Sequence, residues 1–164
     1  MYEYRAQINR VVDGDTVDCD IELGFGVVLA DERVRIMGID TPESRTSNSV
    51  EKLFGKAAKA RLGELLGKTC VLKTQIAKNG EDMKGKFGRI LGDFVAEDGR
   101  MVTVVMEDEG HCVPYYGGSK EETQAQHMTN RTRLLSEGIV SQADYDKAMK
   151  KEEKKALKEA KKAK

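Results

Sequence analysis

The sequence contains no tryptophan, two prolines and three cysteines. The cysteines Cys19, Cys70 and Cys112 lie far apart, and none belongs to a Cys-x-x-Cys pair. This spacing indicates neither a zinc site nor the disulfide framework of small secreted proteins. We therefore expect the three thiols to be small core residues of a protein in a reducing compartment.

Long apolar runs are also missing. No stretch approaches the roughly 20 apolar residues of a membrane-spanning helix, and the polar start of the chain lacks the apolar centre of a signal peptide. The sequence as given therefore predicts a cytoplasmic protein without a membrane partner, which we expect to be a monomer. Its 164 residues suffice for one domain with a proper core and an appendage.

A net charge is absent from the whole chain but not from its parts. Residues 150–164 hold eight lysines and three glutamates, a net charge of +5, so the neutral total leaves residues 1–149 at −5. An acidic body is unusual for a protein that attracts nucleic acid by its overall charge, although it suits a site that needs a cation. The basic end is interpreted either as a solvated helix or as an arm that holds long nucleic acid.

Alternation of apolar and polar residues predicts a meander of three strands at 2–8, 17–23 and 27–36, with turns at 13–15 and 24–26. Helical spacing then predicts a helix over 50–66, with Asn48 and Glu51 placed as a capping box and Gly67 as its end. The remaining elements are two strands at 69–77 and 87–95 around a polar loop at 78–86, a segment at 102–109 that suits a strand or a short helix, and helices beginning at Ser119 and Ser141.

Three strands, a helix and two strands is the order of the five-stranded Greek-key barrel called the OB-fold, which often binds oligonucleotides. We therefore expect an α+β, mainly β fold with about three helices packed on the barrel and a charged C-terminal helix. The expected division is a barrel domain over residues 1–137 and a Lys/Glu/Ala-rich helical tail over residues 138–164.

The segment 33–43 concentrates the candidate chemistry. It begins as a strand that carries Arg35, and Pro42 is expected to end that strand in a turn. Two carboxylates, Asp40 and Glu43, stand at this exit. A cation with anions around it suits phosphate and metal chemistry, but a solvated surface ion pair explains the segment alone equally well.

Three blocks of sequence resemble the signatures of the staphylococcal nuclease (thermonuclease) family. They are VVDGDT at 11–16, VRIMGIDTPE at 34–43 and KFGR at 86–89. Their order and spacing match the family, and the resemblance extends over roughly residues 2–137. One such block would be a weak signal, whereas three blocks together with the expected barrel form a specific one.

The resemblance implies a Ca²⁺ site formed by Asp15, Asp40 and the backbone carbonyl of Thr41, with Asp13 holding a ligand water. Hard oxygen ligands that are few in number suit Ca²⁺ that is bound loosely and shared with a phosphate oxygen. The residues themselves exclude a helix–loop–helix calcium site, because Val17 stands where that loop needs an oxygen ligand.

The resemblance assigns catalysis to Arg35, Arg89 and Glu43. Planar guanidinium groups pair with phosphate oxygens and act most strongly where negative charge grows in the transition state. A carboxylate can take a proton from the attacking water or hold that water in line. The alternative interpretations are a strand-to-strand ion pair for Arg35 and a loop clamp for Arg89.

Substrate contacts are expected from Lys84 and Lys86, which can hold a neighbouring phosphate, and from Tyr115 and Tyr116, which can stack on a base. The sequence departs from the family here, because Phe87 replaces a frequent tyrosine and the two tyrosines are adjacent. The histidines His111 and His127 are interpreted as solvated or capping residues.

The predicted function is a Ca²⁺-dependent endonuclease that cleaves single-stranded and frayed double-stranded DNA, and RNA as well. It would show little sequence specificity, because no residue resembles a reader of base edges, and it would leave 3′-phosphate ends. One alternative is a non-catalytic oligonucleotide-binding module, which has no need of the carboxylates. Another is a protein-binding barrel whose acidic body docks basic partners.

Overall fold

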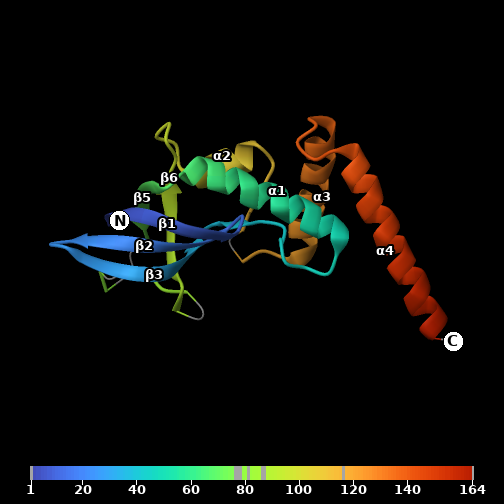
Figure 1. The fold of residues 1–164 in the computed structure, drawn as a ribbon, viewed down its shortest axis with the longest axis horizontal. Helices are drawn as coiled ribbons and strands as arrows, with labels where there is room; N and C mark the ends of the chain where they lie inside the picture. The colour runs from blue at the N-terminus through green and yellow to red at the C-terminus, as the bar shows by residue number, and fades with distance from the viewer. Residues whose placement is uncertain (1, 76–78, 81, 86–87, 116, 164) are drawn as a thin grey trace.

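The computed structural model describes residues 2–75, 79–80, 82–85, 88–115 and 117–163. Within these residues five strands close into a barrel, accompanied by four helices (Figure 1). The strand order is β1-β2-β3-β6-β5, and all neighbours are antiparallel except the pair β3–β6. The strands are β1 (Glu3–Asp13), β2 (Thr16–Gly24), β3 (Val27–Ile36), β5 (Thr69–Thr74) and β6 (Ile90–Val95). The α+β fold with a five-stranded barrel is thereby confirmed.

Alternating apolar side chains fill the barrel as the sequence pattern predicts. On β2, Val17, Cys19 and Ile21 are buried against Leu72 of β5 and Phe94 of β6 in one core cluster. The cysteines are free thiols, of which Cys19 and Cys112 are buried and Cys70 is partly buried. Burial raises the pKa of Cys19 and of Cys70 to about 12 each, so these thiols stay protonated at neutral pH.

The pattern of β2 fails at two places. Asp18 is buried rather than solvent-facing, and its carboxylate lies 2.6 Å from Arg10 and 2.8 Å from Arg33. Leu23 is exposed rather than buried, because the β2–β3 hairpin extends beyond the barrel (Figure 1). Phe25 at its tip is fully exposed and has a positive φ of 56°.

Helix α1 (Ser49–Leu66) begins and ends where its sequence signals lie. The Asn48 side chain accepts hydrogen bonds from the backbone N–H groups of Val50 and Glu51, and Gly67 ends the helix with a φ of 62°. The capping box is only half formed, because Glu51 Oε1 accepts from the N–H of Glu43 at 3.4 Å instead of from its own cap residue. The helix terminus is thus joined to the segment that carries the candidate chemistry.

The predicted boundaries are confirmed only in part. The strand predicted over 27–36 is β3, but the turn that follows it lies at Gly38 (φ 76°) and not at Pro42. A short strand β4 (Ile39–Asp40) follows and pairs with β7 (Val113–Pro114). The ambiguous segment forms a helix, α2 (Val102–Asp108), and β5 ends at Thr74. Residues 76–78, 81 and 86–87, on which parts of the predicted strands and loop fall, lie outside the described residues.

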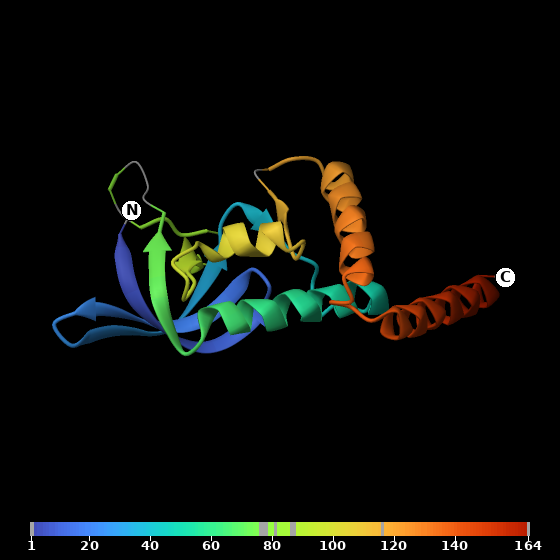
Figure 2. The ribbon, with the colours of Figure 1, turned by 90° about the horizontal axis from the view of Figure 1, so that it is seen from above.

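The last two helices, α3 (Lys120–Ser136) and α4 (Gln142–Lys162), begin after the predicted caps. The hydroxyl oxygens of Ser119 and Ser141 accept hydrogen bonds from backbone N–H groups three residues later, at 3.2 and 3.1 Å. A second core cluster joins α1 to this end of the chain through Phe54, Leu134 and Tyr145. From there α4 projects away from the barrel (Figure 2). The domain boundary at residue 137 stays a prediction.

Candidate functional site

A polar pocket of about 240 Å³ opens at one end of the barrel. Its walls come from the β1–β2 turn, the end of β3, the segment after β4 and the start of β6. All the predicted catalytic and metal-binding residues line it, together with Thr16 and Pro42: Asp13, Asp15, Arg35, Asp40, Thr41, Glu43 and Arg89. The fold therefore brings together residues that lie up to 76 positions apart in the sequence.

Arg35 is held in place by contacts on three sides. Its guanidinium lies 3.2 Å from Asp15 Oδ2 and donates hydrogen bonds to the carbonyl oxygens of Ile36 and Ile39, the latter at 2.9 Å. Asp15 Oδ1 in turn accepts a hydrogen bond from the Thr16 hydroxyl at 2.9 Å. The ion pair of the alternative interpretation therefore exists, and it also holds the guanidinium at the wall of the pocket.

Asp13 ties the β1–β2 turn to the chain after Glu43. Its Oδ1 accepts hydrogen bonds from both the backbone N–H, at 3.2 Å, and the hydroxyl of Ser44. Asp13 lines the polar pocket together with Asp15, and its role of holding a ligand water stays a prediction. Its observed contacts show a structural task, which is to fix two loops relative to each other.

Asp40 has a partner that the sequence analysis missed. His127 of α3 places its Nε2 atom 2.8 Å from Asp40 Oδ2. The interpretation of both histidines as solvated or capping residues is wrong, since His127 is 7% exposed and His111 is 4% exposed. His127 and Leu134 are seven residues apart and both buried, so the inward face of α3 was visible in the sequence as a helical spacing.

Helix α1 supports the pocket from behind. A Cβ atom at Gly55 would overlap the backbone of Glu43 and approach Ser44 N to 2.7 Å, and one at Gly14 would lie 2.8 Å from Ala58 Cβ. Glycine at these positions allows the helix to lie directly against both loops that carry candidate carboxylates. Together with the Glu51–Glu43 hydrogen bond, this close packing fixes the position of the Glu43 backbone, from which its side chain extends.

The donor atoms suit a cation that is held by few protein ligands. Asp15 and Asp40 supply hard carboxylate oxygens to one pocket, and the buried Oγ1 of Thr41 has no hydrogen-bond partner in the described part of the chain. Among the described residues no three His, Cys, Asp or Glu side chains cluster as metal ligands. A closed metal cage is therefore not what these residues form, whereas an open Ca²⁺ site completed by water and phosphate fits them.

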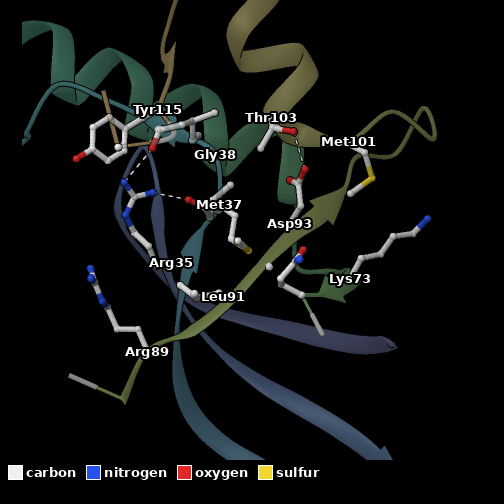
Figure 3. A pocket seen from close by; sticks show the side chains of 15 residues that line it. Arg35, Met37, Gly38, Lys73, Arg89, Leu91, Asp93, Met101, Thr103 and Tyr115 are labelled. Carbon is white, nitrogen blue, oxygen red and sulfur yellow. Dashed lines mark hydrogen bonds between the residues drawn. The ribbon is translucent and has the colours of Figure 1, made fainter. Parts of the chain in front are cut away.

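A second, larger groove of about 850 Å³ adjoins the polar pocket. Arg35 and Arg89 line both, and Figure 3 shows them with Tyr115 on one side of the groove, facing Lys73, Asp93 and Met101. Tyr115 is held by a hydrogen bond from its backbone N–H to the carbonyl of Gly38, at 2.9 Å. The arginines thus stand between a pocket of carboxylates and a groove that contains a tyrosine.

The other predicted substrate contacts are less well placed. Lys84 is exposed and lines neither of these two pockets. Lys86 and Tyr116 lie outside the described residues. Tyr115 is therefore the predicted substrate contact that the structure brings to the groove, and the roles of all these residues stay predictions.

Comparisons with known proteins agree with this geometry. A family model described as staphylococcal nuclease homologue matches residues 33–133. Endonuclease YhcR of Bacillus subtilis is 27% identical over 119 residues, which are 70% of this chain and 9% of that protein. The prophage-derived endonuclease YokF of the same organism is 34% identical over 103 residues, 63% of this chain and 31% of YokF. The thermonuclease of Staphylococcus intermedius is 32% identical over 103 residues, 63% of this chain and 55% of the thermonuclease.

The chain thus spans less than two thirds of the length of each of these relatives. The matched segment contains Arg35, Asp40, Glu43, Arg89 and Tyr115. The two aspartates of the β1–β2 turn precede it, and it is the strand pairing of the barrel that brings them to the same pocket.

Proposed function

Because the chain belongs to the staphylococcal nuclease family, we propose that it is an endonuclease that hydrolyses phosphodiester bonds of nucleic acid. The observation that carries the proposal is the polar pocket of about 240 Å³, in which two arginines and four carboxylates converge. Phosphodiester hydrolysis needs a positioned water, a proton acceptor and positive charge beside the phosphorus, and this pocket offers a group for each task.

Arg35 and Arg89 would bind the scissile phosphate. Each planar guanidinium can donate two parallel hydrogen bonds to phosphate oxygens, and both line the boundary between pocket and groove. Arg35 is already restrained by Asp15 and by two backbone carbonyls, so little reorientation is required when charge develops on the phosphate. Glu43, fixed by the packing of α1, would accept the proton of the attacking water.

Asp15, Asp40 and the carbonyl of Thr41 would hold Ca²⁺, with Asp13 beside them. When bound, the ion supplies positive charge to a phosphate oxygen and orients water. The side chain of Asp40 is kept in position by His127, and that of Asp15 by Arg35 and Thr16. These contacts orient the carboxylates before any cation arrives, which lowers the cost of binding one.

The larger groove would hold nucleotides next to the scissile phosphate. Tyr115 offers a ring for base stacking, which favours single-stranded or frayed double-stranded DNA over a closed duplex and also permits RNA. Stacking does not distinguish the bases by their edges, so cleavage with little sequence specificity is expected. In-line attack that expels the 5′ oxygen would leave 3′-phosphate ends.

A cleavage assay on end-labelled single-stranded DNA and RNA tests the proposal. We expect products with 3′-phosphate ends in Ca²⁺ and no cleavage when a calcium chelator is added. The variant Glu43→Gln is the matched control, because it keeps the proposed metal ligands and should bind DNA without cutting it. If the unaltered chain binds DNA but never cleaves it in Ca²⁺, it is a non-catalytic oligonucleotide-binding module instead. Full activity in chelator would overturn the role of the metal.

A further inference from the structure

Four lysines line a groove of about 270 Å³ between α1 and α4. Lys52 and Lys56 come from α1, and Lys147 and Lys151 come from α4. Each pair is spaced by four residues, so its two side chains lie on one face of their helix. One carboxylate, that of Asp144, shares the groove with them. These four residues are called the lysine groove below.

The two helices are fastened to each other, so the lysines cannot move apart as the side chains of a loose tail would. Glu152 Oε1 accepts a hydrogen bond from the backbone N–H of Ser49, and Lys155 Nζ donates one to the carbonyl of Ser47, each at 2.6 Å. The rings of Phe54 and Tyr145 pack edge to face, with their centroids 6.1 Å apart. The half of α4 nearest the barrel is therefore a fixed wall of the groove.

The positive charge in the lysine groove is not balanced within the described part of the chain, where none of the four lysines forms an ion pair. Like charges at this helical spacing repel each other and destabilise the helix slightly. Binding of an anion between the two helices would relieve this repulsion.

The lysine groove shares turns of α1 with the contacts that support the candidate site. Glu51 and Gly55 of α1 contact Glu43, through a hydrogen bond and through backbone packing. Lys52 and Lys56 follow them by one residue each, which rotates them by about 100° around the helix axis. These lysines therefore stand on the same turns of α1 as the contacts to Glu43, where a polyanion that leaves the polar pocket along the start of this helix can reach them.

We propose that the lysine groove binds backbone phosphates of single-stranded nucleic acid, and so extends the substrate track beyond the candidate site. The inference deepens the proposed function and depends on it for the identity of the polyanion. A membrane surface fits less well, because the groove is concave and α4 exposes only scattered apolar side chains, Met149 and Leu157, among its charges. A run of phosphates matches the sign of the charge on the four lysines.

The test is the salt dependence of DNA binding with catalysis blocked by a calcium chelator. Two groove variants, Lys52→Gln/Lys56→Gln and Lys147→Gln/Lys151→Gln, are compared with the control Lys154→Gln/Lys158→Gln. The control removes the same charge at the same helical spacing from α4, but outside the groove. All six lysines are exposed, so each variant is expected to fold, which circular dichroism checks.

On a single strand of about 30 nucleotides, each groove variant should reduce the log–log salt slope by about 1.4, because two phosphate contacts are lost at about 0.7 each. The control should keep the slope of the unaltered chain. Equal slopes for all proteins, or an equal loss in the control, would overturn the proposal. So would groove variants that lose binding to phosphatidylserine vesicles while their DNA slope stays unchanged.

This experiment separates the groove from the nuclease. Binding is measured without cleavage, so a reduced slope in a chain that never cuts DNA would support the groove and contradict the enzyme. If the unaltered chain cleaves DNA while the groove variants keep their full salt slope, the result would support the enzyme and contradict the groove.

Discussion

The Nε2 atom of His127 lies 2.8 Å from Oδ2 of Asp40. The two residues are 87 positions apart, and the contact joins helix α3 to the last residue of β4. Because His127 is buried, its ring has little freedom to swing away. The orientation of a proposed Ca²⁺ ligand is therefore set by a helix outside the barrel.

Loss of this contact should weaken metal binding. We expect His127→Ala to raise the Ca²⁺ dissociation constant by about tenfold or more, as is usual when the partner of a metal ligand is removed. Isothermal titration calorimetry measures this directly, without reference to activity. His127→Gln retains a hydrogen-bond donor and should restore part of the affinity. The control is His111→Gln, which alters the other buried histidine and should leave Ca²⁺ affinity unchanged.

The glycines of α1 allow a paired test of how Glu43 is positioned. Gly55→Ala places a methyl group into the backbone of Glu43, so it should destabilise the fold by about 1–3 kcal/mol and lower the rate of cleavage. Gly63→Ala meets nothing closer than Val11 Cγ2 at 3.9 Å and should stabilise the fold by about 0.5–1 kcal/mol. Urea unfolding of both variants checks the stabilities. Stabilisation by both substitutions would show that α1 does not press on the Glu43 loop.

Arg35→Lys separates transition-state stabilisation from ground-state binding. Lysine keeps the charge but cannot donate to Ile36, Ile39 and a phosphate in one planar arrangement. We expect kcat to fall by about a hundredfold to a thousandfold while KM changes little. Steady-state kinetics on a short DNA substrate gives both constants. A change confined to KM would assign Arg35 to substrate binding alone.

Asp18 should make stability depend on pH in the acid range. Its hydrogen bonds with Arg33, and then with Arg10, lower the pKa of the Asp18 carboxyl against the opposing effect of burial. A depressed pKa in the folded state contributes stability that is present above the unfolded value of about 4 and is lost as pH falls through the folded value. We expect Asp18→Asn to cost about 1–3 kcal/mol at neutral pH, and the difference from the unaltered chain to shrink below about pH 4.

His111 should make the stability of the fold depend on pH in a higher range, near neutrality. Burial lowers the pKa of its imidazole, outweighing the nearby carboxylate of Glu109. The unfolded chain therefore binds the proton first, and stability falls as pH drops below the unfolded value of about 6.5. Thermal unfolding at pH 7.5 and pH 5.5 should show a smaller loss for His111→Gln than for the unaltered chain. An equal loss in both would mean that other groups control this range.

Sequence reasoning succeeds where a residue's role depends on its neighbours in the chain. The end of α1 at Gly67 and the serine caps of α3 and α4 are local signals, and the structure confirms them. The residues of the polar pocket were also named in advance, but only because three separate sequence blocks resemble one family. No local pattern states that Asp15 and Arg89 share a pocket.

It fails where a distant partner decides the outcome. Asp18 has the pattern of a solvated residue. It is buried nevertheless, because ion pairs with two arginines from neighbouring strands offset the free-energy cost of removing its charge from water. The contact of His127 with Asp40 forms only because α3 docks near β4. The lysine groove likewise forms only because α4 docks on α1. These dockings are set by the cluster of Phe54, Leu134 and Tyr145, whose members come from three helices.

The way the barrel closes has a consequence for the order of events during synthesis. Glu3 of β1 pairs with Lys73 of β5, and Val34 of β3 pairs with Ile90 of β6, so the two edges of the early meander find their partners only once β5 and β6 have been synthesised. Pairings of such long sequence separation are slow to form. Arg89 stands directly before β6, and hence the pocket in which it meets Arg35 arises only with the last strand of the barrel. A chain that stops before β6 therefore has neither a closed barrel nor the pocket at its end.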